Sequence, residues 1–396
     1  MQTLQELTRQ AQALANGEHV PLSADEQEAA RVLNICNGCR YCEGFCAVFP
    51  AMTRRLEFGK ADVNYLANLC HNCGACLHSC QYAPPHSFAI SIPQTMAAVR
   101  GQTYQEYSWP RPLGKLYRRN GLTLTLAAFA ALSLFLILAV GLGGQGWDAL
   151  WGAVDFGGNF YNLFPHNLMV GLFAPVFLFS LVALAMGVRQ FWRDITPVTG
   201  GTPVPPPAAA EAAHNVLSLK YLDGGHGAGC NNEDDAFTLA RRRCHHFTFY
   251  GFMLCFAATA LGTVYHYLFG WSAPYDLPSI PKILGAAGGT LMIIGTAGLW
   301  RLHTRRHPEH VLAQQKAMDR GFIALLFIIA ATGIILWLTR GTPALALMLC
   351  LHLAAVMTFF LTMPYSKFAH GFYRSAALLR HNTEKRLPNP VGLGSE

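Results

Sequence analysis

Apolar residues gather in six long stretches along the chain. Each stretch is close to the length of about 20 residues that a membrane-spanning helix needs. The weakest stretch, Ile283–Trp300, is rich in Gly and Ala. Glycine is tolerated in membrane helices and favours close contact between them, so we retain this stretch. The pattern predicts six spanning helices, at Gly121–Leu142, Leu168–Val188, Phe247–Phe269, Ile283–Trp300, Phe322–Leu338 and Ala344–Met363.

Outside these stretches the hydrophobic pattern is shorter. Apolar residues recur at helical spacing in Leu4–Asn16, Ala24–Asn34 and Asp62–Leu69, which predicts three short helices. Thr196–Ala213 is dominated by proline and alanine, which predicts a stiff linker that does not fold. The polar segment Met1–Ala30 has no apolar core, so we expect no cleavable signal peptide.

Composition and charge place the chain in a membrane. Hydrophobic residues make up 52% of its 396 residues and charged residues 13%, against about 25% charged in a soluble domain. With the N-terminus in the cytoplasm, the outer loops hold only Lys282 and Arg340 of the 29 basic residues. This bias predicts a multi-pass protein of the bacterial inner membrane with both termini cytoplasmic. It also explains the net charge of +7, so no nucleic-acid partner is expected.

Eight of the 12 cysteines occur in two runs with the spacing C-x2-C-x2-C-x3-C. In such runs the first three cysteines bind one [4Fe–4S] cluster and the fourth binds the other cluster. We therefore expect two clusters, each held by four thiols that we call the first and second quartets. The first quartet is Cys36, Cys39, Cys42 and Cys80, and the second is Cys70, Cys73, Cys76 and Cys46.

Zinc and disulfides are the alternatives for these thiols. Zinc sites use two pairs of ligands rather than two runs of four, and a cytoplasmic segment disfavours disulfides. The proline that commonly follows the fourth cysteine is missing after both Cys46 and Cys80, so packing there is expected to differ. Cys230, Cys244, Cys255 and Cys350 show no ligand spacing and are expected to be packing or loop residues.

Histidines mark both ends of the third and sixth predicted spans. His245 and His246 precede the third span and His266 lies near its outer end, while His352 and His370 bracket the sixth. Histidine inside a membrane is costly and indicates function. Because these two helices are antiparallel, the pattern predicts two bis-histidine haem b sites, one near each face. Helical phase favours His245 over His246 as the inner ligand.

Other histidines offer alternatives or plain surface roles. Histidines at helix ends are often interfacial rather than ligands, and that alternative remains open. His166 is a spare candidate at the outer face and His303 at the inner face. His307, His310 and His381 are interpreted as exposed inner-surface residues.

Several motifs carry resemblances to known families. About the first 100 residues resemble the helical two-cluster ferredoxin domain of succinate dehydrogenases and heterodisulfide reductases, and the four-histidine layout is similar to the cytochrome b subunit of respiratory nitrate reductase. The two cysteine runs, six spans, Tyr221–Gly225 and Arg241–His246 together resemble the tricarballylate- or citrate-utilisation protein B family, a module also similar to the C-terminal part of a cobalamin-pathway flavoprotein.

That resemblance implies an activity. Family members oxidise the reduced FAD of a partner dehydrogenase that converts tricarballylate to cis-aconitate, and they pass electrons to membrane quinone. The chain shows no flavin fingerprint of its own, so a separate flavoprotein is expected. It is expected to act as an electron-transfer subunit of a quinone-reducing oxidoreductase, and whether it is itself an enzyme stays open. Alternatives are a membrane-anchored ferredoxin without haem that docks a soluble flavoenzyme, or a cluster-based redox sensor.

The expected fold class is all-α, with a helical two-[4Fe–4S] ferredoxin domain followed by a six-helix transmembrane bundle. The expected parts are the ferredoxin domain at 1–110, two spans at 111–190, a Pro/Gly-rich cytoplasmic loop at 191–246, a four-helix haem-binding part at 247–370 and a cytoplasmic tail at 371–396.

Overall fold

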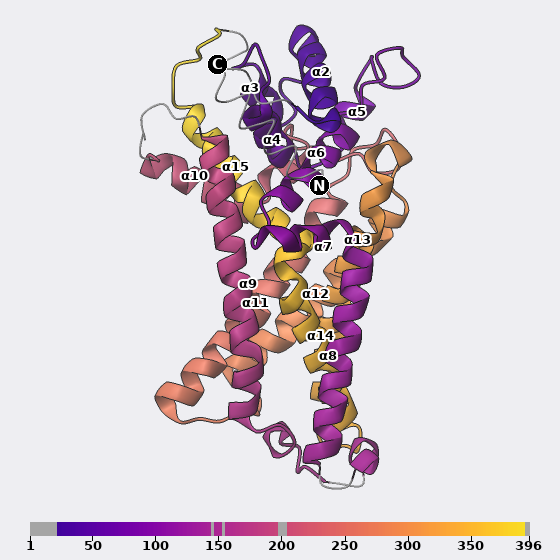
Figure 1. Ribbon diagram of the computed structural model, residues 1–396, viewed down its shortest axis with the longest axis vertical. Helices are drawn as coiled ribbons and strands as arrows, with labels where there is room; N and C mark the ends of the chain where they lie inside the picture. The colour runs from indigo at the N-terminus through magenta and orange to yellow at the C-terminus, as the bar shows by residue number, and fades with distance from the viewer. Residues whose placement is uncertain (1–21, 144–145, 153–154, 197–203, 393–396) are drawn as a thin grey trace.

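The computed structural model describes residues 22–392 apart from 144–145, 153–154 and 197–203. Within these residues all regular structure is helical, and the only β pairing is an isolated bridge between Cys230 and Thr238. A head of short helices covers one end of a bundle of long helices (Figure 1). The all-α prediction is confirmed, while the helix predicted at Leu4–Asn16 lies outside the described residues.

The head contains the predicted helices together with others around the cysteines. The helix expected at Ala24–Asn34 continues to Cys39, and the one expected at Asp62–Leu69 begins two residues earlier. Both pack on a common core of fully buried side chains, including Val32, Leu66 and Met96. The head helices are α2 (Ala24–Cys39), α3 (Val48–Met52), α4 (Lys60–Leu69), α5 (Ala75–His78) and α6 (Ile92–Glu106).

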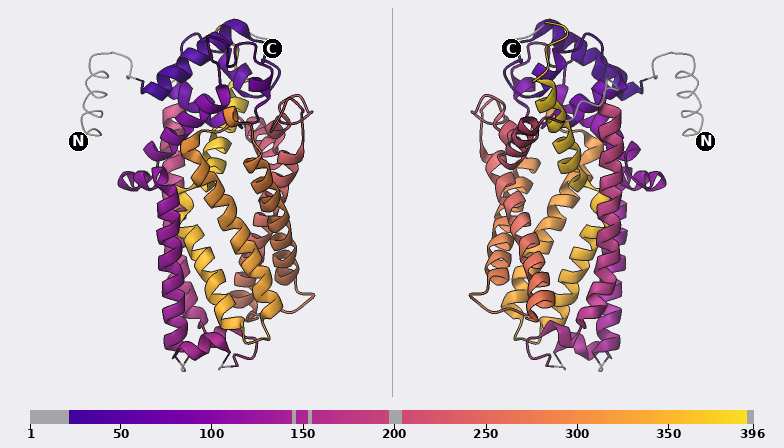
Figure 2. Two further views of the ribbon diagram at one scale, coloured as in Figure 1. Left: turned by 90° about the vertical axis from the view of Figure 1, so that its right-hand side faces the viewer. Right: turned by 90° about the vertical axis from the view of Figure 1, so that its left-hand side faces the viewer.

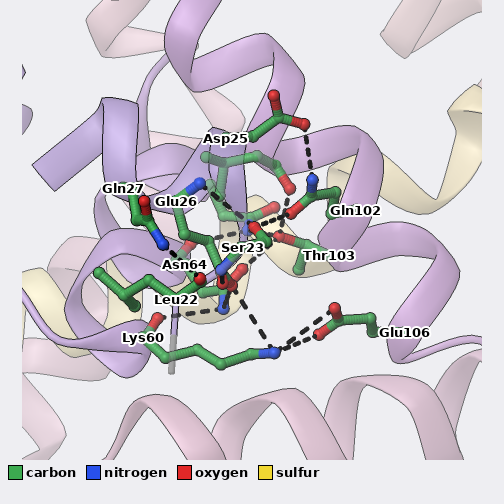
Figure 3. A network of polar contacts seen from close by, with 12 residues as sticks. Leu22, Ser23, Asp25, Glu26, Gln27, Lys60, Asn64, Gln102, Thr103 and Glu106 are labelled. Carbon is green, nitrogen blue, oxygen red and sulfur yellow. Dashed lines mark hydrogen bonds and ion pairs between the residues drawn. The ribbon is translucent and has the colours of Figure 1, made fainter. Parts of the chain in front are cut away.

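A polar network joins α2, α4 and α6 (Figure 3). Ser23 and Glu26 form a capping box, in which the Ser23 Oγ accepts from the Glu26 N–H at 3.3 Å and the Glu26 carboxylate accepts from the Ser23 N–H at 2.8 Å. Such a cap contributes about 1 kcal/mol. The same buried carboxylate lies 3.7 Å from Lys60 of α4, which also pairs with Glu106 of α6. The three helices are therefore fixed to one another by charge as well as by packing.

In the part of the chain that the structure describes, six helices are long and apolar enough to cross a membrane, which confirms the number predicted from the sequence. Each predicted stretch lies within one of them or overlaps nearly all of it. Large apolar side chains such as Phe129 (71% exposed) and Leu268 (75% exposed) point away from the bundle, as lipid-facing residues do. The helices are α8 (Asn120–Leu142), α9 (His166–Ile195), α11 (Ala240–Phe269), α12 (Ile280–Thr304), α13 (Lys316–Thr339) and α14 (Leu345–Thr362).

The glycine-rich α12 packs closely on α11. A Cβ added at Gly288 would lie 2.7 Å from the carbonyl oxygen of Gly251, and one added at Gly295 would lie 2.5 Å from Thr248. Contacts this short leave no room for larger side chains, which is why glycine suits the interface. The composition that made this span the weakest prediction is therefore what holds the helix pair together.

The last helix, α15 (His370–Glu384), connects the bundle to the head (Figure 2). Near its end, Glu384 accepts from Arg55 at 2.5 Å and from Arg380 at 2.8 Å, and both arginines also reach Asp62 of α4. The guanidinium groups of Arg55 and Arg380 both lie over the buried Tyr65 ring, at 5.1 and 4.2 Å from its centre. Since all four charged groups are largely buried, this network fixes the end of the chain to α4.

One prediction about the loop between the second and third spans is wrong. The Pro- and Ala-rich stretch folds in its second half as α10 (Pro206–Leu217), which packs against α15. Proline at the first helical positions is compatible with a helix start because the missing N–H has no partner there, and the alanines that follow favour helix strongly. The prolines begin this helix, whereas we had taken them as evidence against folding.

Candidate functional site

The first quartet lines a hollow in the head. Cys36 and Cys39 come from the last turn of α2, and Cys42 and Cys80 from the loops beside it. Burial raises the pKa of the Cys36 thiol to about 12, with contributions from the other three thiols of the quartet. The side-chain amide nitrogen of Gln81, Nε2, donates to the sulfur of Cys39 at 3.8 Å. The structure therefore brings together the four thiols that sequence spacing assigned to one cluster.

Backbone amides lie close to the fourth cysteine of each run. Burial raises the pKa of the Cys46 and Cys80 thiols, whereas the amides of Val48 and Phe49 lower the pKa of Cys46 and those of Tyr82 and Ala83 lower the pKa of Cys80. The Ala83 N–H itself donates to the Cys80 carbonyl at 3.3 Å. Amides near a sulfur favour the thiolate, the form that binds iron.

The second quartet lies deeper in the protein. Cys70 and Cys73 are 6% and 7% exposed, and Cys46 and Cys76 lie near them at the starts of α3 and α5. The amide of Asn72 donates to the Cys70 sulfur at 3.4 Å. Gly74 has a positive φ of 87° and starts α5, so glycine at this position lets the backbone turn between the second and third thiols.

Two runs of four thiols suit two clusters better than zinc. A zinc ion takes four ligands at about 2.0–2.3 Å from one point, commonly as two pairs. A [4Fe–4S] cluster takes one thiol at each of four corners, which is the number that each quartet supplies. Among the described residues no three His, Cys, Asp or Glu side chains lie close enough to hold a single metal ion.

A glycine-rich loop, residues 223–230, covers the second quartet. A Cβ added at Gly225 would lie 1.2 Å from the carbonyl oxygen of Phe45, so this glycine sits directly on the backbone that leads into Cys46. Cys230, at the end of the loop, is fully buried and its thiol interacts with that of Cys73. The sequence had left Cys230 as a packing or loop residue, because it follows no ligand spacing.

The inner-face histidines meet at the junction of head and bundle. His245 of α11 and His370 of α15 have ring centres 6.2 Å apart, with the rings at 73°. A metal ion between two imidazoles lies about 2 Å from each ligand nitrogen, which places the ring centres about 6 Å apart. Nδ1 of His370 donates to the carbonyl of Lys367, which leaves Nε2 unprotonated. Burial holds the pKa of His370 well below its usual value, so the ring is neutral. The separation of the His245 and His370 rings and the free Nε2 of His370 match what a haem iron with two axial histidines requires.

His246 faces elsewhere. Its Nε2 donates to the carbonyl of Ser218 at 3.1 Å, and its ring lies beside Tyr250. Of the two adjacent histidines, the one that helical phase favoured, His245, faces His370.

The outer-face histidines have different neighbours from those expected. The ring of His266 stacks on that of His166, with centres 3.8 Å apart and an angle of 24°. His352 contacts α13, where its Nδ1 lies 3.1 Å from the Thr332 hydroxyl. Two rings stacked face to face at this distance leave no room for an ion between them. An outer haem between His266 and His352 stays a prediction.

Two of the three histidines interpreted as surface residues are buried. His310 is fully buried, with its Nε2 2.9 Å from that of His78, and His381 is 7% exposed. Only His307 is partly exposed. His310 fills the space over Gly74, where an added Cβ would lie 2.4 Å from the ring. The interpretation is wrong because other segments cover these residues: the head covers His310, and Tyr221 of the loop before the third span lies beside His381. Local sequence does not reveal such contacts.

Four arginines converge on the loop of the second quartet, and sequence reasoning missed this role. Arg374 donates to the Cys70 carbonyl at 2.9 Å, and Arg100 donates to the same oxygen at 3.1 Å. Arg241 and Arg306 both donate to the carbonyl of Asn72. The available signal was Arg241-Arg242-Arg243 before the third span, which we interpreted only as a positive-inside anchor.

A helical head with two runs of cysteines, joined to six apolar helices with a half-buried histidine pair at the junction, defines a membrane electron-transfer protein with an iron–sulfur head. Family models agree: residues 29–106 match the "Citrate utilization protein B Fer4-like domain" and residues 116–391 match "Citrate utilization protein B". The chain is also 57% identical over 376 residues to the citrate utilization protein B of Escherichia coli, covering 95% of this chain and 97% of that protein. The chain belongs to the citrate utilization protein B family. No solved structure matches it.

Proposed function

We propose that this protein carries electrons from the reduced flavin of a partner dehydrogenase to membrane quinone, using two [4Fe–4S] clusters and b-type haem. The observation that carries the proposal is the link between the second quartet and the half-buried His245–His370 pair: Arg374, one helical turn after His370, donates to the Cys70 carbonyl at 2.9 Å. When bound, the clusters and the haem would exchange single electrons, which converts the two-electron chemistry of a flavin into one-electron steps.

The chain's own residues support the clusters. Eight thiols lie in two groups, the Asn72 amide donates to the Cys70 sulfur, and the Fer4-like match covers both runs. Cys36, Cys39, Cys42 and Cys80 would hold one cluster, and Cys46, Cys70, Cys73 and Cys76 the other.

The histidines support one haem most directly. His245 and His370 face each other at a suitable distance, and the hydrogen bond from His370 to Lys367 leaves Nε2 free to bind. A second haem at the outer face would use His266 and His352. That haem needs the His166–His266 stack to open.

The orientation follows from charge. An even number of spans puts the head and α15 on the same side of the membrane (Figure 2). That side carries all but two of the 29 basic residues, so we place it in the bacterial cytoplasm. A flavoprotein dissolved in the cytoplasm could then reach the first quartet, whose hollow opens beside the exposed Tyr41.

The partner and its substrate rest on resemblance. The Escherichia coli relative is named for citrate utilisation, and the family resemblance points to tricarballylate dehydrogenase. Citrate and tricarballylate are both tricarboxylates, and a flavin dehydrogenase that oxidises such a substrate needs an acceptor for two electrons. A lipid quinone is the apolar two-electron carrier of the phase that holds the six helices.

The test uses the purified full chain with a reduced flavoprotein and a soluble quinone analogue. We expect a reduced-minus-oxidised spectrum with b-type haem bands and quinone reduction that depends on the chain. His370→Ala should abolish the inner haem signal and slow quinone reduction, whereas His246→Ala, its matched control, should do neither. A spectrum without haem bands would refute the haem part of the proposal.

The second candidate is a membrane-anchored ferredoxin without haem. The observation that favours it is the stacked His166–His266 pair, which as it stands holds no iron. This candidate predicts two clusters by electron paramagnetic resonance, no haem bands, and unchanged activity in His370→Ala.

A further inference from the structure

The four arginines around the second quartet form a group that we call the arginine belt, made of Arg100, Arg241, Arg306 and Arg374. They come from four separate segments, α6, α11, the loop after α12, and α15. Their guanidinium groups all donate to backbone carbonyls between Ala67 and Asn72. Four long side chains from distant parts of the sequence therefore meet on one short loop.

The belt carries positive charge that no carboxylate neutralises directly. None of the ion pairs formed within the described part of the chain includes any of the four arginines. The acids that act on this region have other partners: Asp223 pairs with Arg242 at 3.5 Å, and Asp319 pairs with Lys367 at 2.9 Å. Arg100 is 3% exposed, the other three arginines are half-buried, and the Nε atoms of Arg306 and Arg374 are buried without a hydrogen-bond partner. Arginines in such a setting are usually paired with an anion, so this group points to an anionic group that it faces.

Two of the belt residues also line up with the histidine pair. Arg241 precedes His245 by four residues on α11, and Arg374 follows His370 by four residues on α15. Residues four apart share a helix face. The charge therefore lies between the second quartet and the His245–His370 pair.

The first quartet has a different setting. Its hollow contains one arginine, Arg40, whose Nε donates to the Asn37 carbonyl. Arg40 is half-buried, as are Arg241, Arg306 and Arg374, so the two quartets differ in the number of positive charges beside them, one against four. Each charge away from bulk water acts through a lower effective dielectric. The two quartets are thus chemically equivalent in their ligands and unequal in their surrounding charge.

From this asymmetry we infer that the arginine belt raises the reduction potential of the cluster held by the second quartet above that of the first. The inference rests on the proposed function only in taking both quartets to hold clusters. Reduction adds one electron to a cluster, with no bond formed or broken in the protein, and so adds one negative charge. Positive charge nearby stabilises that reduced form, and net charge and hydrogen bonding are among the main determinants of such potentials. An electron on the head would therefore rest at the second quartet, next to the histidine pair.

The experiment is a redox titration of the purified full chain followed by electron paramagnetic resonance. Cys36→Ser and Cys73→Ser assign the two signals by removing one cluster each. Arg241→Gln and Arg374→Gln should each shift the midpoint of the second cluster to more negative potential and leave the first unchanged. Arg243→Gln is the matched control, because Arg243 belongs to the same basic triplet and is exposed.

Arg374→Lys separates charge from folding. It keeps the positive charge, so we expect a midpoint close to that of the unchanged protein even though the hydrogen bond to Cys70 is altered. Equal shifts of both clusters, no shift, or a shift confined to a haem signal would overturn the inference. The titration needs neither haem nor quinone, so failure of those parts of the proposed function would be seen separately. A chain that holds no cluster at all would refute both.

Discussion

Replacing Gly225 by alanine should uncover the second quartet, and the structure supplies a matched control. Gly225 and Gly227 have nearly the same backbone conformation, with φ of 87° and 85°. A side chain at positive φ costs roughly 1–2 kcal/mol, so both alanine variants pay this strain. The two positions differ in the space around an added Cβ. At Gly225 that Cβ would lie 1.2 Å from the Phe45 carbonyl oxygen, whereas at Gly227 no other atom would lie within 4 Å of it. Because unbonded atoms need about 3.5 Å, the loop must retreat by about 2 Å at Gly225.

That retreat takes the loop off the backbone leading into Cys46. We expect Gly225→Ala to lose the cluster of the second quartet faster in air, measured by the decay of its visible absorbance and its electron paramagnetic resonance signal. Gly227→Ala should lower the unfolding temperature slightly and keep the rate of cluster loss. Equal rates of loss in the two variants would refute the reasoning, because backbone strain alone would then explain both.

Three further predictions concern the ligands and the ion network. His245→Ala should remove the inner haem bands while His246→Ala keeps them, and bands that vanish in both would contradict the assignment by helical phase. Cys73→Ser should eliminate one cluster signal, whereas Cys230→Ser should keep both, which iron and sulfide analysis can count. Burial alone would raise the pKa of Glu384, but its two arginine partners hold the pKa below the usual value. Its stabilising effect is therefore full above the unfolded pKa of about 4.3 and is lost as pH falls through the lower folded pKa. Thermal unfolding of Glu384→Gln against pH should show a weaker acid dependence; an unchanged profile would contradict this role.

The sequence predicted the elements with a strong local signal. The length of the six apolar stretches and the spacing of the two cysteine runs are enough to predict helices and clustered thiols. Within the described residues, the structure contains the six helices and groups the thiols of the first quartet. Helical phase likewise distinguished His245 from His246, because both lie on one helix and differ only in direction.

The remaining features depend on contacts between distant segments. The sequence indicates exposure for His310 and His381, but the head covers His310 and the loop before the third span places Tyr221 beside His381. The position of Cys230 beside Cys73 follows no spacing rule, since a loop after α10 brings it there. The arginine belt assembles from four segments, and only one of them, the basic triplet before α11, is conspicuous in the sequence.

The ion network at the end of α15 has a consequence for biogenesis. Arg55, in the N-terminal head, depends on Glu384, which is translated 329 residues later. Removing one member of a buried ion pair costs about 3–5 kcal/mol, so the head made early in translation lacks part of its stabilisation. Its final contacts form only after all six spans have entered the membrane and the last helix has been made. Maturation of the iron–sulfur head is thereby tied to completed membrane insertion, and a truncated chain released before α15 would lack the contacts that lock the head in place.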